Sequence, residues 1–282
     1  MELPEKYINP LTDFGFKKLF GEEVNKELLI DFLNELLPER HKIKELNYQQ
    51  NEQLSSAEYE RKAIFDLYCE SEKGEKFIVE IQRARQNFFK DRSVYYASFP
   101  IQQQAIKGSN WDFRLAAVYT IGILDFIFEE EKDDKDYIHT VQLKNQKNKV
   151  FYDKLTFIYI ELPKFDKNLE ELDSKIDKWL FLFRYLAKLQ ERPLALQERI
   201  FQKLFAAAEI AKYSPEEREL YEESLKYYRD LKNVVDTAFD DGELKGKIEG
   251  KIEIAKNLKR MGLNVEQIIE ATGLSKEEIE NL

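Results

Sequence analysis

The sequence predicts an α/β core followed by a helical C-terminal extension. Three observations support this fold class. Two short apolar runs at residues 62–70 and 76–82 flank a Gly-containing turn, as in a β-hairpin. Two further β-rich runs, at 115–124 and 150–162, follow a helical segment. After Leu169 the strand patterns end and helical patterns take over.

The helices of the core are predicted from apolar spacing. From Val24 to Leu37 apolar residues recur at helical spacing until Pro38 ends the run. A second helix is expected over Gln86 to Ile106, where Pro100 either bends it or ends its first part.

The hairpin brings polar side chains together. If Glu70 pairs with Lys76 across the turn, Asp66 faces Glu80. Two carboxylates opposite one another repel and destabilise a sheet unless a positive group lies between them. Mg²⁺ prefers carboxylate oxygens and fits this position. Because side chains alternate along a strand, Gln82 lies on the same face as Glu80 and can converge on the same point.

The two later strands differ in character. The run 115–124 is apolar, short and rich in β-branched residues, as expected of a buried central strand. The run 150–162 alternates and ends at Pro163, and residues 133–136 between the two runs form a charged loop. Glu161 at the strand end is expected to be structural, paired with Lys164 or Arg184.

Three amphipathic helices are predicted beyond the strands, at 172–189, 194–213 and 215–238. The first carries Trp179 and Phe183 and is too apolar for a solvated helix. We therefore expect this region to pack on the α/β core.

The tail has a pattern of its own. Gly242, Gly246 and Gly250 recur every four residues, although Gly costs about 1 kcal/mol in a helix. Close approach of a second helix and a flexible hinge both explain them. Residues 264–282 then resemble a helix-turn-helix with a capping box at Ser275. Its second helix is too acidic to read DNA bases, so a protein-contact or targeting role is favoured.

Composition limits the classes of function. With 282 residues, 35% of them charged, and few Gly or Pro, the chain suits a helix-rich globular protein of one or two domains. It shows neither a signal segment nor a membrane-spanning run, so we expect a cytoplasmic protein without membrane contact. The single Cys69 excludes an internal disulfide, and His41 and His139 leave little material for zinc or histidine chemistry.

The net charge of −10 argues against a strong non-specific grip on nucleic acid. Locally, residues 81–114 carry six basic residues and two acids, a net charge of +4 directly after the carboxylates. A positive patch in this place suits a phosphodiester substrate, with Arg83, Arg85 and Arg92 as the expected phosphate contacts. The alternative is that these residues solvate one helix face.

The pattern of Asp66 followed by Glu80-x-Gln82 resembles the D…(D/E)xK signature of the PD-(D/E)XK nuclease superfamily, with Gln in the position of Lys. More closely, the chain resembles the Rpn-type recombination-promoting nucleases, also described as PD-(D/E)XK family transposases. The matching stretches are Tyr7–Gly21, Phe65–Glu70, Phe77–Gln82, Arg92–Tyr96, Ile160–Phe165 and Asp241–Leu282.

This resemblance implies a restriction-endonuclease-like core over 1–168, a helical region packed on it over 169–239, and a Gly-repeat helix with a helix-turn-helix-like tail over 240–282. It implies a metal-dependent DNA endonuclease that hydrolyses phosphodiester bonds and is linked to recombination or mobile elements. The cofactor would be Mg²⁺, for which Mn²⁺ can substitute. The tail would offer a surface for homo-oligomers.

The same resemblance implies roles for single residues. Asp66 and Glu80 would hold the metal and Gln82, which has no charge, would orient the attacking water. The alternative for the two acids is a salt bridge to Arg61, to Lys62 or to an arginine of the core. Accessory roles fall to Asp13, Lys17 and Glu35, with Asp31 as the alternative to Glu35 and helix capping or solvation as the alternative for all. The rival function is a catalytically weak or inactive nuclease-fold module that binds protein or DNA through its helical C-terminus.

Overall fold

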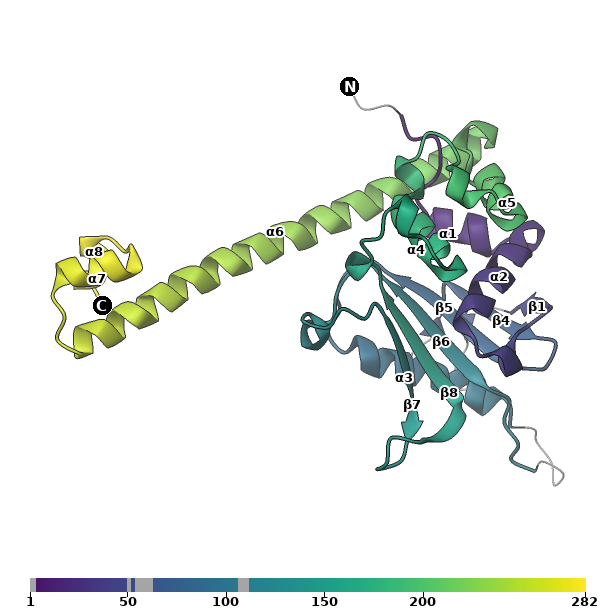
Figure 1. The fold of residues 1–282 in the computed structure, drawn as a ribbon, viewed down its shortest axis with the longest axis horizontal. Helices are drawn as coiled ribbons and strands as arrows, with labels where there is room; N and C mark the ends of the chain where they lie inside the picture. Colours follow the sequence, from purple (N-terminus) through teal and green to yellow (C-terminus); the bar gives the residue numbers. More distant parts are fainter. Residues whose placement is uncertain (1–3, 50–51, 54–62, 106–111) are drawn as a thin grey trace. The chain divides into compact units, whose positions relative to one another are not determined.

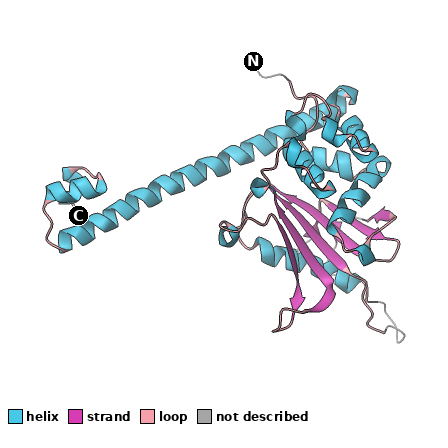
Figure 2. Cartoon of the chain, viewed as in Figure 1, coloured by secondary structure: helices cyan, strands magenta, loops and turns pink. Residues whose placement is uncertain are grey.

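A computed structural model of the chain describes residues 4–49, 52–53, 63–105 and 112–282. It divides into two compact units, Met1–Tyr228 and Arg229–Leu282. The first unit holds a mixed six-stranded sheet with helices packed against it (Figures 1 and 2). The predicted α/β class with a helical C-terminal region is confirmed. Lys62, Arg61 and Ile106, used above as element ends or ion-pair partners, lie outside the described residues.

The sheet has the strand order β1-β4-β5-β6-β8-β7. Strands β5, β6 and β8 run parallel in its middle, and antiparallel strands lie outside them on both sides. A separate two-stranded sheet pairs β2 with β3. The bounds are β1 (Leu46–Tyr48), β2 (Glu52–Gln53), β3 (Ala63–Ile64), β4 (Leu67–Ser71), β5 (Lys76–Gln82), β6 (Val118–Leu124), β7 (Ile138–Lys144) and β8 (Val150–Glu161).

The helices agree in order with the predicted ones, and their ends differ. Helix α3 continues past Pro100 to Gln103, and α6 runs unbroken through the tail glycines. Strands β1 and β7 were not predicted. The bounds are α1 (Asp13–Phe20), α2 (Lys26–Leu36), α3 (Phe89–Gln103), α4 (Lys175–Tyr185), α5 (Arg199–Ala208), α6 (Pro215–Arg260), α7 (Val265–Thr272) and α8 (Lys276–Glu280), with short 3₁₀ helices between several of them.

The predicted hairpin register is confirmed. Glu70 pairs with Lys76 in the β4–β5 ladder, and their side chains form an ion pair of 2.5 Å. The same register pairs Leu67 with Val79 at the other end of the ladder. Asp66 directly precedes β4, so it lies next to the C-terminal half of β5.

The two faces of the sheet are covered by different helices. Phe77 and Ile81 of β5 belong to the large hydrophobic cluster that the sheet shares with α1, α2, α4 and α5, whereas Ile78 packs with Tyr96 of α3. Alternation along β5 therefore turns its even-numbered residues, Glu80 among them, toward α3.

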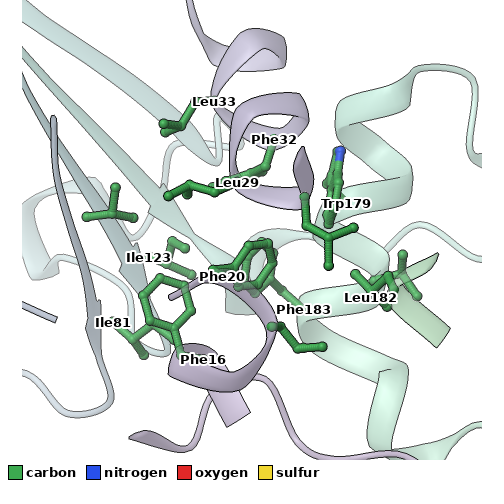
Figure 3. Packing of buried hydrophobic residues seen from close by; sticks show 14 of the residues in the cluster. Phe16, Phe20, Leu29, Phe32, Leu33, Ile81, Ile123, Trp179, Leu182 and Phe183 are labelled. Atoms are coloured by element: carbon green, nitrogen blue, oxygen red, sulfur yellow. The ribbon is translucent and has the colours of Figure 1, made fainter. Parts of the chain in front are cut away.

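Aromatic side chains fill the space between the helices and the sheet (Figure 3). Phe20 of α1 stacks on Phe183 of α4 at 5.3 Å and lies 5.8 Å from the fully buried Trp179. Phe32 of α2 contacts the same two rings. The predicted packing of the region beyond Leu169 on the core is thereby confirmed.

Local sequence fixes the start of α1. The Thr12 hydroxyl accepts a hydrogen bond from the Gly15 backbone N–H (3.0 Å), so Thr12 caps the helix. A Cβ atom at Gly15 would lie 2.1 Å from the Asn9 carbonyl oxygen, which only glycine avoids. Asp13 is thus free of the capping role and stands exposed in the first turn.

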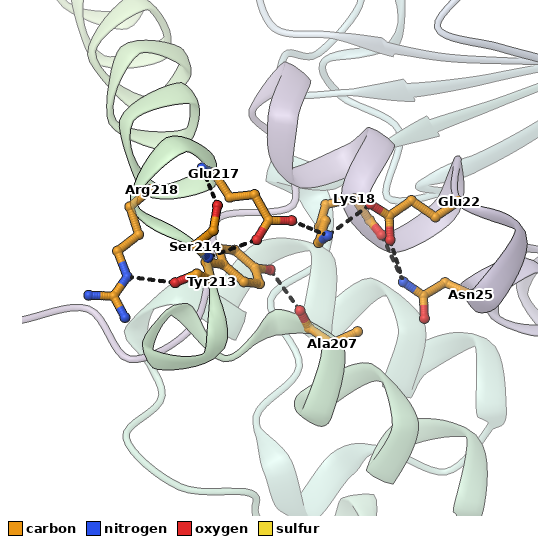
Figure 4. Close-up of polar contacts among 8 residues, drawn as sticks. All are labelled: Lys18, Glu22, Asn25, Ala207, Tyr213, Ser214, Glu217 and Arg218. Atoms are coloured by element: carbon orange, nitrogen blue, oxygen red, sulfur yellow. Dashed lines mark hydrogen bonds and ion pairs between the residues drawn. The ribbon is translucent and has the colours of Figure 1, made fainter.

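The first turns of α6 are docked on α1. Lys18 of α1 lies between Glu22 (2.8 Å) and Glu217 of α6 (2.6 Å), as Figure 4 shows. About two turns further along α6, the Ser224 hydroxyl accepts a hydrogen bond of 3.1 Å from the Phe14 backbone N–H. These contacts hold the first turns of α6 against α1.

The second unit has a small core of its own. It consists of Ala255, Ile268, Leu274 and Ile279, from the end of α6 and from α7 and α8. The predicted capping box of Ser275 and Glu278 is confirmed. Apart from neighbouring residues of α6 itself, no atom of the described residues lies within 4 Å of a Cβ built on Gly242, Gly246 or Gly250. A search of the described residues shows that none of their helices combines the length and apolarity a membrane crossing requires.

Candidate active site

Two carboxylates meet where β4 begins and β5 ends. The Asp66 Oδ2 atom accepts a hydrogen bond of 2.7 Å from the Ile81 backbone N–H, which fixes the carboxylate beside β5. Glu80 and Gln82 are only 7% and 8% exposed and lie on the α3 face of the strand. The charge of Asp66 thus acts on Glu80, while the convergence of Asp66, Glu80 and Gln82 on one point stays a prediction.

Burial acts on the pKa values of both carboxylates. Burial, and after it the nearby charge of Asp66, raise the pKa of Glu80 to about 7, although the charge of Arg92 opposes them. Burial also raises the pKa of Asp66, although the hydrogen bond from Ile81 opposes it. Two buried acids that resist ionisation favour a cation between them.

Arg92 of α3 supplies the positive charge that Gln82 lacks. Its Nη2 atom donates to Gln82 Oε1 at 2.6 Å and lies 3.8 Å from Glu80 Oε2. The Gln82 Nε2 atom in turn donates to the Ala84 carbonyl at 2.9 Å. The guanidinium lies over the rings of Phe89 and Tyr96, at 5.2 and 5.7 Å, and these rings orient it.

Comparison with known protein families shows to which family the chain belongs. The model of the PD-(D/E)XK nuclease family transposases matches residues 10–238. The chain is a member of this family. Neither the curated proteins nor the solved structures contain a match to the chain. The membership supports a nuclease or transposase-like function, and the sheet with Asp66 and Glu80 is its PD-(D/E)XK core.

The three predicted phosphate-binding arginines have different surroundings in this PD-(D/E)XK core. Arg92 contacts the predicted catalytic residues directly. Arg83 donates from Nε to the Leu11 carbonyl (2.8 Å) and lowers the pKa of Asp66, so it lies near the carboxylates. Arg85 is exposed and pairs with Glu129 at 3.2 Å.

The predicted accessory residues also separate. Lys17 and Asp13 form an exposed ion pair of 2.9 Å, and the charges of both act on Asp66. Glu35 is exposed on α2, and no contact of the described residues brings it to the carboxylates. Asp31, its alternative, accepts from the buried Trp179 Nε1 at 2.9 Å and pairs with Lys175, which makes it structural.

A second group of ligand atoms was not predicted. Atoms of Glu131, Asp134 and His139 lie within 4.8 Å of one another and could hold a metal ion. His139 belongs to β7, which β6 and β8 separate from β5. Its Nε2 atom lies 2.8 Å from the buried Glu161, which also pairs with Lys164 at 2.5 Å, as predicted. The charged loop before β7 could have indicated this group of ligands from the sequence, but the strand that carries His139 was not predicted.

Proposed function

We propose that this PD-(D/E)XK protein is a metal-dependent endonuclease that hydrolyses phosphodiester bonds of DNA at Asp66, Glu80 and Gln82. The observation that carries the proposal is the pair of buried carboxylates with raised pKa values, placed against Arg92. A structural ion pair that dominates would lower the pKa of an acid, whereas here burial raises the pKa of both acids in spite of Arg92 and of the Ile81 N–H. A bound cation or a proton would therefore stabilise them.

The donor set fits Mg²⁺. Asp66 and Glu80 offer carboxylate oxygens, the ligands that Mg²⁺ and Mn²⁺ prefer, and their mutual repulsion disappears when a cation binds. A bound metal ion would lower the pKa of a water molecule and neutralise charge on the scissile phosphate. Asp66 would keep its orientation through the Ile81 N–H.

The chain's own residues supply the rest. Arg92 reaches the site with its Nη2 atom and stabilises the negative charge that develops on the phosphate. Gln82 is held by Ala84 on one side and Arg92 on the other, and the second lone pair of its Oε1 orients the attacking water. Arg83, next to Asp66, binds a flanking phosphate.

DNA is the proposed substrate, with a role in recombination or mobile elements. The family's description as a nuclease family transposase supports both. The net charge of −10 implies weak binding at physiological salt, so low salt is the informative condition.

The test is nicking of supercoiled plasmid DNA at low salt with Mg²⁺ or Mn²⁺, compared with EDTA. Asp66→Asn and Glu80→Gln keep the shape of each side chain and remove its charge. We expect each to lower the rate at least about 100-fold, as loss of a metal ligand or charge stabiliser does. Glu45→Gln, at an acid whose side chain is 70% exposed, is the control. Full activity of either site variant contradicts the assignment.

The substitution of Gln82 for the usual Lys favours one second candidate, a nuclease-fold module that binds DNA or protein without cleaving. Wild-type protein that binds the plasmid and leaves it intact with both ions establishes this alternative. Its partner would then be expected on the helical C-terminal region.

A further inference from the structure

A pocket of about 820 Å³ is lined by residues of α1 and of the first part of α6. It is also lined by Arg83 and by Leu67, which directly follows Asp66 in the chain. Asp13 and Lys17 of α1 line it as well, and with Arg83 they are the side chains whose charges act on Asp66. The pocket therefore approaches the proposed cleavage site from the side of Asp66, whereas Glu80 faces α3.

The part of α6 that lines the pocket carries an apolar and an aromatic side chain besides Glu223 and Ser224. Leu220, Ser224 and Tyr227 lie on one face of the helix and line the pocket, and Leu220 and Tyr227 are 54% and 60% exposed. The Tyr228 hydroxyl donates to Asp125 at 2.7 Å, and the Ser224 hydroxyl accepts from the Phe14 N–H, so this part of α6 has a fixed rotation. Tyr227 is presented to the pocket by a rigid backbone.

The charges of the pocket balance. Lys17, Lys18 and Arg83 line it together with the acids Asp13, Glu22 and Glu223. Glu22 and Glu217 already neutralise Lys18. Arg83 donates one N–H to the neutral carbonyl of Leu11, and this hydrogen bond does not neutralise its positive charge. Such a pocket suits a neutral, flat group attached to one phosphate better than it suits a free anion.

We propose that this pocket holds an unpaired nucleobase next to the scissile phosphate, stacked on Tyr227 with its phosphate toward Arg83. The substrate class of the nuclease is then single-stranded or locally unpaired DNA rather than intact duplex, an inference that rests on the proposed function. A base inside a duplex cannot reach a side pocket without leaving the stack, which costs a few kcal/mol. An aromatic ring returns part of this cost for any base, because every base has a face to stack.

The test uses binding without cleavage. Three oligonucleotides of one sequence carry 2-aminopurine at the same position: in a paired duplex, in a one-nucleotide bulge and in a single strand. Anisotropy gives the Kd, and 2-aminopurine quenching reports stacking, in EDTA at low salt. The variants are Tyr227→Ala and Tyr227→Phe, and Phe239→Ala is the matched control at an aromatic residue of α6 that is 69% exposed and outside the pocket.

We expect the bulge and the single strand to bind more tightly than the paired duplex and to be quenched. Tyr227→Ala should weaken their binding at least about fivefold, the lower end of the stacking contribution, and leave the duplex unchanged. Tyr227→Phe should keep the preference, and Phe239→Ala should behave as wild type. Equal binding of the three forms, or an unaltered preference in Tyr227→Ala, overturns the proposal. Because this readout needs no metal, a protein that shows the preference but does not nick plasmid DNA supports the base pocket while refuting the proposed cleavage.

Discussion

Replacing Glu80 by Gln should stabilise the metal-free protein at high pH. The folded-state pKa of Glu80 is about 7, against 4.5 for an unperturbed Glu. Because the raised pKa favours the protonated form in the folded state, stability is highest below pH 4.5 and falls as the pH rises toward 7. At about 1.36 kcal/mol per pKa unit, the whole penalty is about 3 kcal/mol, and most of it arises between pH 5 and pH 8.

Gln is a neutral mimic of the protonated acid and carries no such penalty. The melting temperature of Glu80→Gln minus that of wild type should therefore grow between pH 5 and pH 8, by at least about 5 °C for a domain of this size. Scanning calorimetry in EDTA measures it, and the difference between the two proteins cancels the titration of all other groups. Glu45→Gln, exposed and distant from Asp66 in the sequence, should show no such growth.

The same experiment tests the metal. At pH 8, Mg²⁺ should raise the melting temperature of wild type, because it binds the folded state alone, and should raise that of Glu80→Gln far less. A melting-temperature difference that is equal at pH 5 and pH 8 would refute the electrostatic argument. It would mean that solvent or Arg92 already neutralises Glu80 in the folded protein.

Three further outcomes are expected. Arg92→Ala should lower the rate of plasmid nicking at least about 100-fold. The double variant Gln82→Lys, Arg92→Gln should regain part of the activity that Arg92→Gln loses, whereas Gln82→Lys alone should not help, since a lysine beside Arg92 would repel it. Additive losses in the double variant would contradict the idea that Arg92 supplies the missing charge. A chain ending at Phe239 should nick plasmid DNA as wild type does, because the carboxylates lie in the first unit; loss of DNA binding in that chain would make the tail a DNA reader. Alanine at Gly242, Gly246 and Gly250 should slow hydrogen exchange in α6, with the free energy of helix opening rising by up to about 1 kcal/mol per site, because a Cβ there contacts no described atom outside the neighbouring part of α6. A fall in the mass of the protein in solution would instead reveal that a helix from another molecule packs on these glycines.

Elements with strong local patterns could be predicted from the sequence. The hairpin register followed from Glu70, Gly74 and Lys76, and the buried strand β6 followed from an apolar run that is covered on both faces. Strand β7 could not be found in this way. It is an edge strand with half-exposed residues such as Val141 and Leu143, so one face lacks the burial that produces a clear pattern.

In the tail, a clear local pattern of glycines gave a misleading indication of where the helix ends. Three glycines within nine residues favour a break, yet α6 continues through them. The Leu, Ile, Lys and Glu residues around them are good helix formers and offset the cost of the glycines. The predicted division of the chain at residues 168 and 239 stays a prediction.

For the candidate site too, local patterns predicted some residues, whereas others depend on how distant elements pack. Asp66, Glu80 and Gln82 share one hairpin, so strand alternation was enough to predict that they converge. Arg92 was identified as a phosphate ligand, but its bond to Gln82 depends on how α3 packs on the sheet. Tyr227 is more than 200 positions away from Asp13 in the sequence and faces the same pocket, a proximity that only the docking of α6 on α1 creates.

The single cysteine has a practical consequence. Cys69 is fully buried in β4, and burial raises the pKa of its thiol well above the usual range, so it stays protonated and unreactive in the folded protein. A thiol introduced on the surface would thus be the only one open to maleimide dyes, without prior removal of the native residue. Placed at the exposed Leu220 or Phe239, such a dye would report DNA approaching the pocket or the tail separately, one fluorophore per chain.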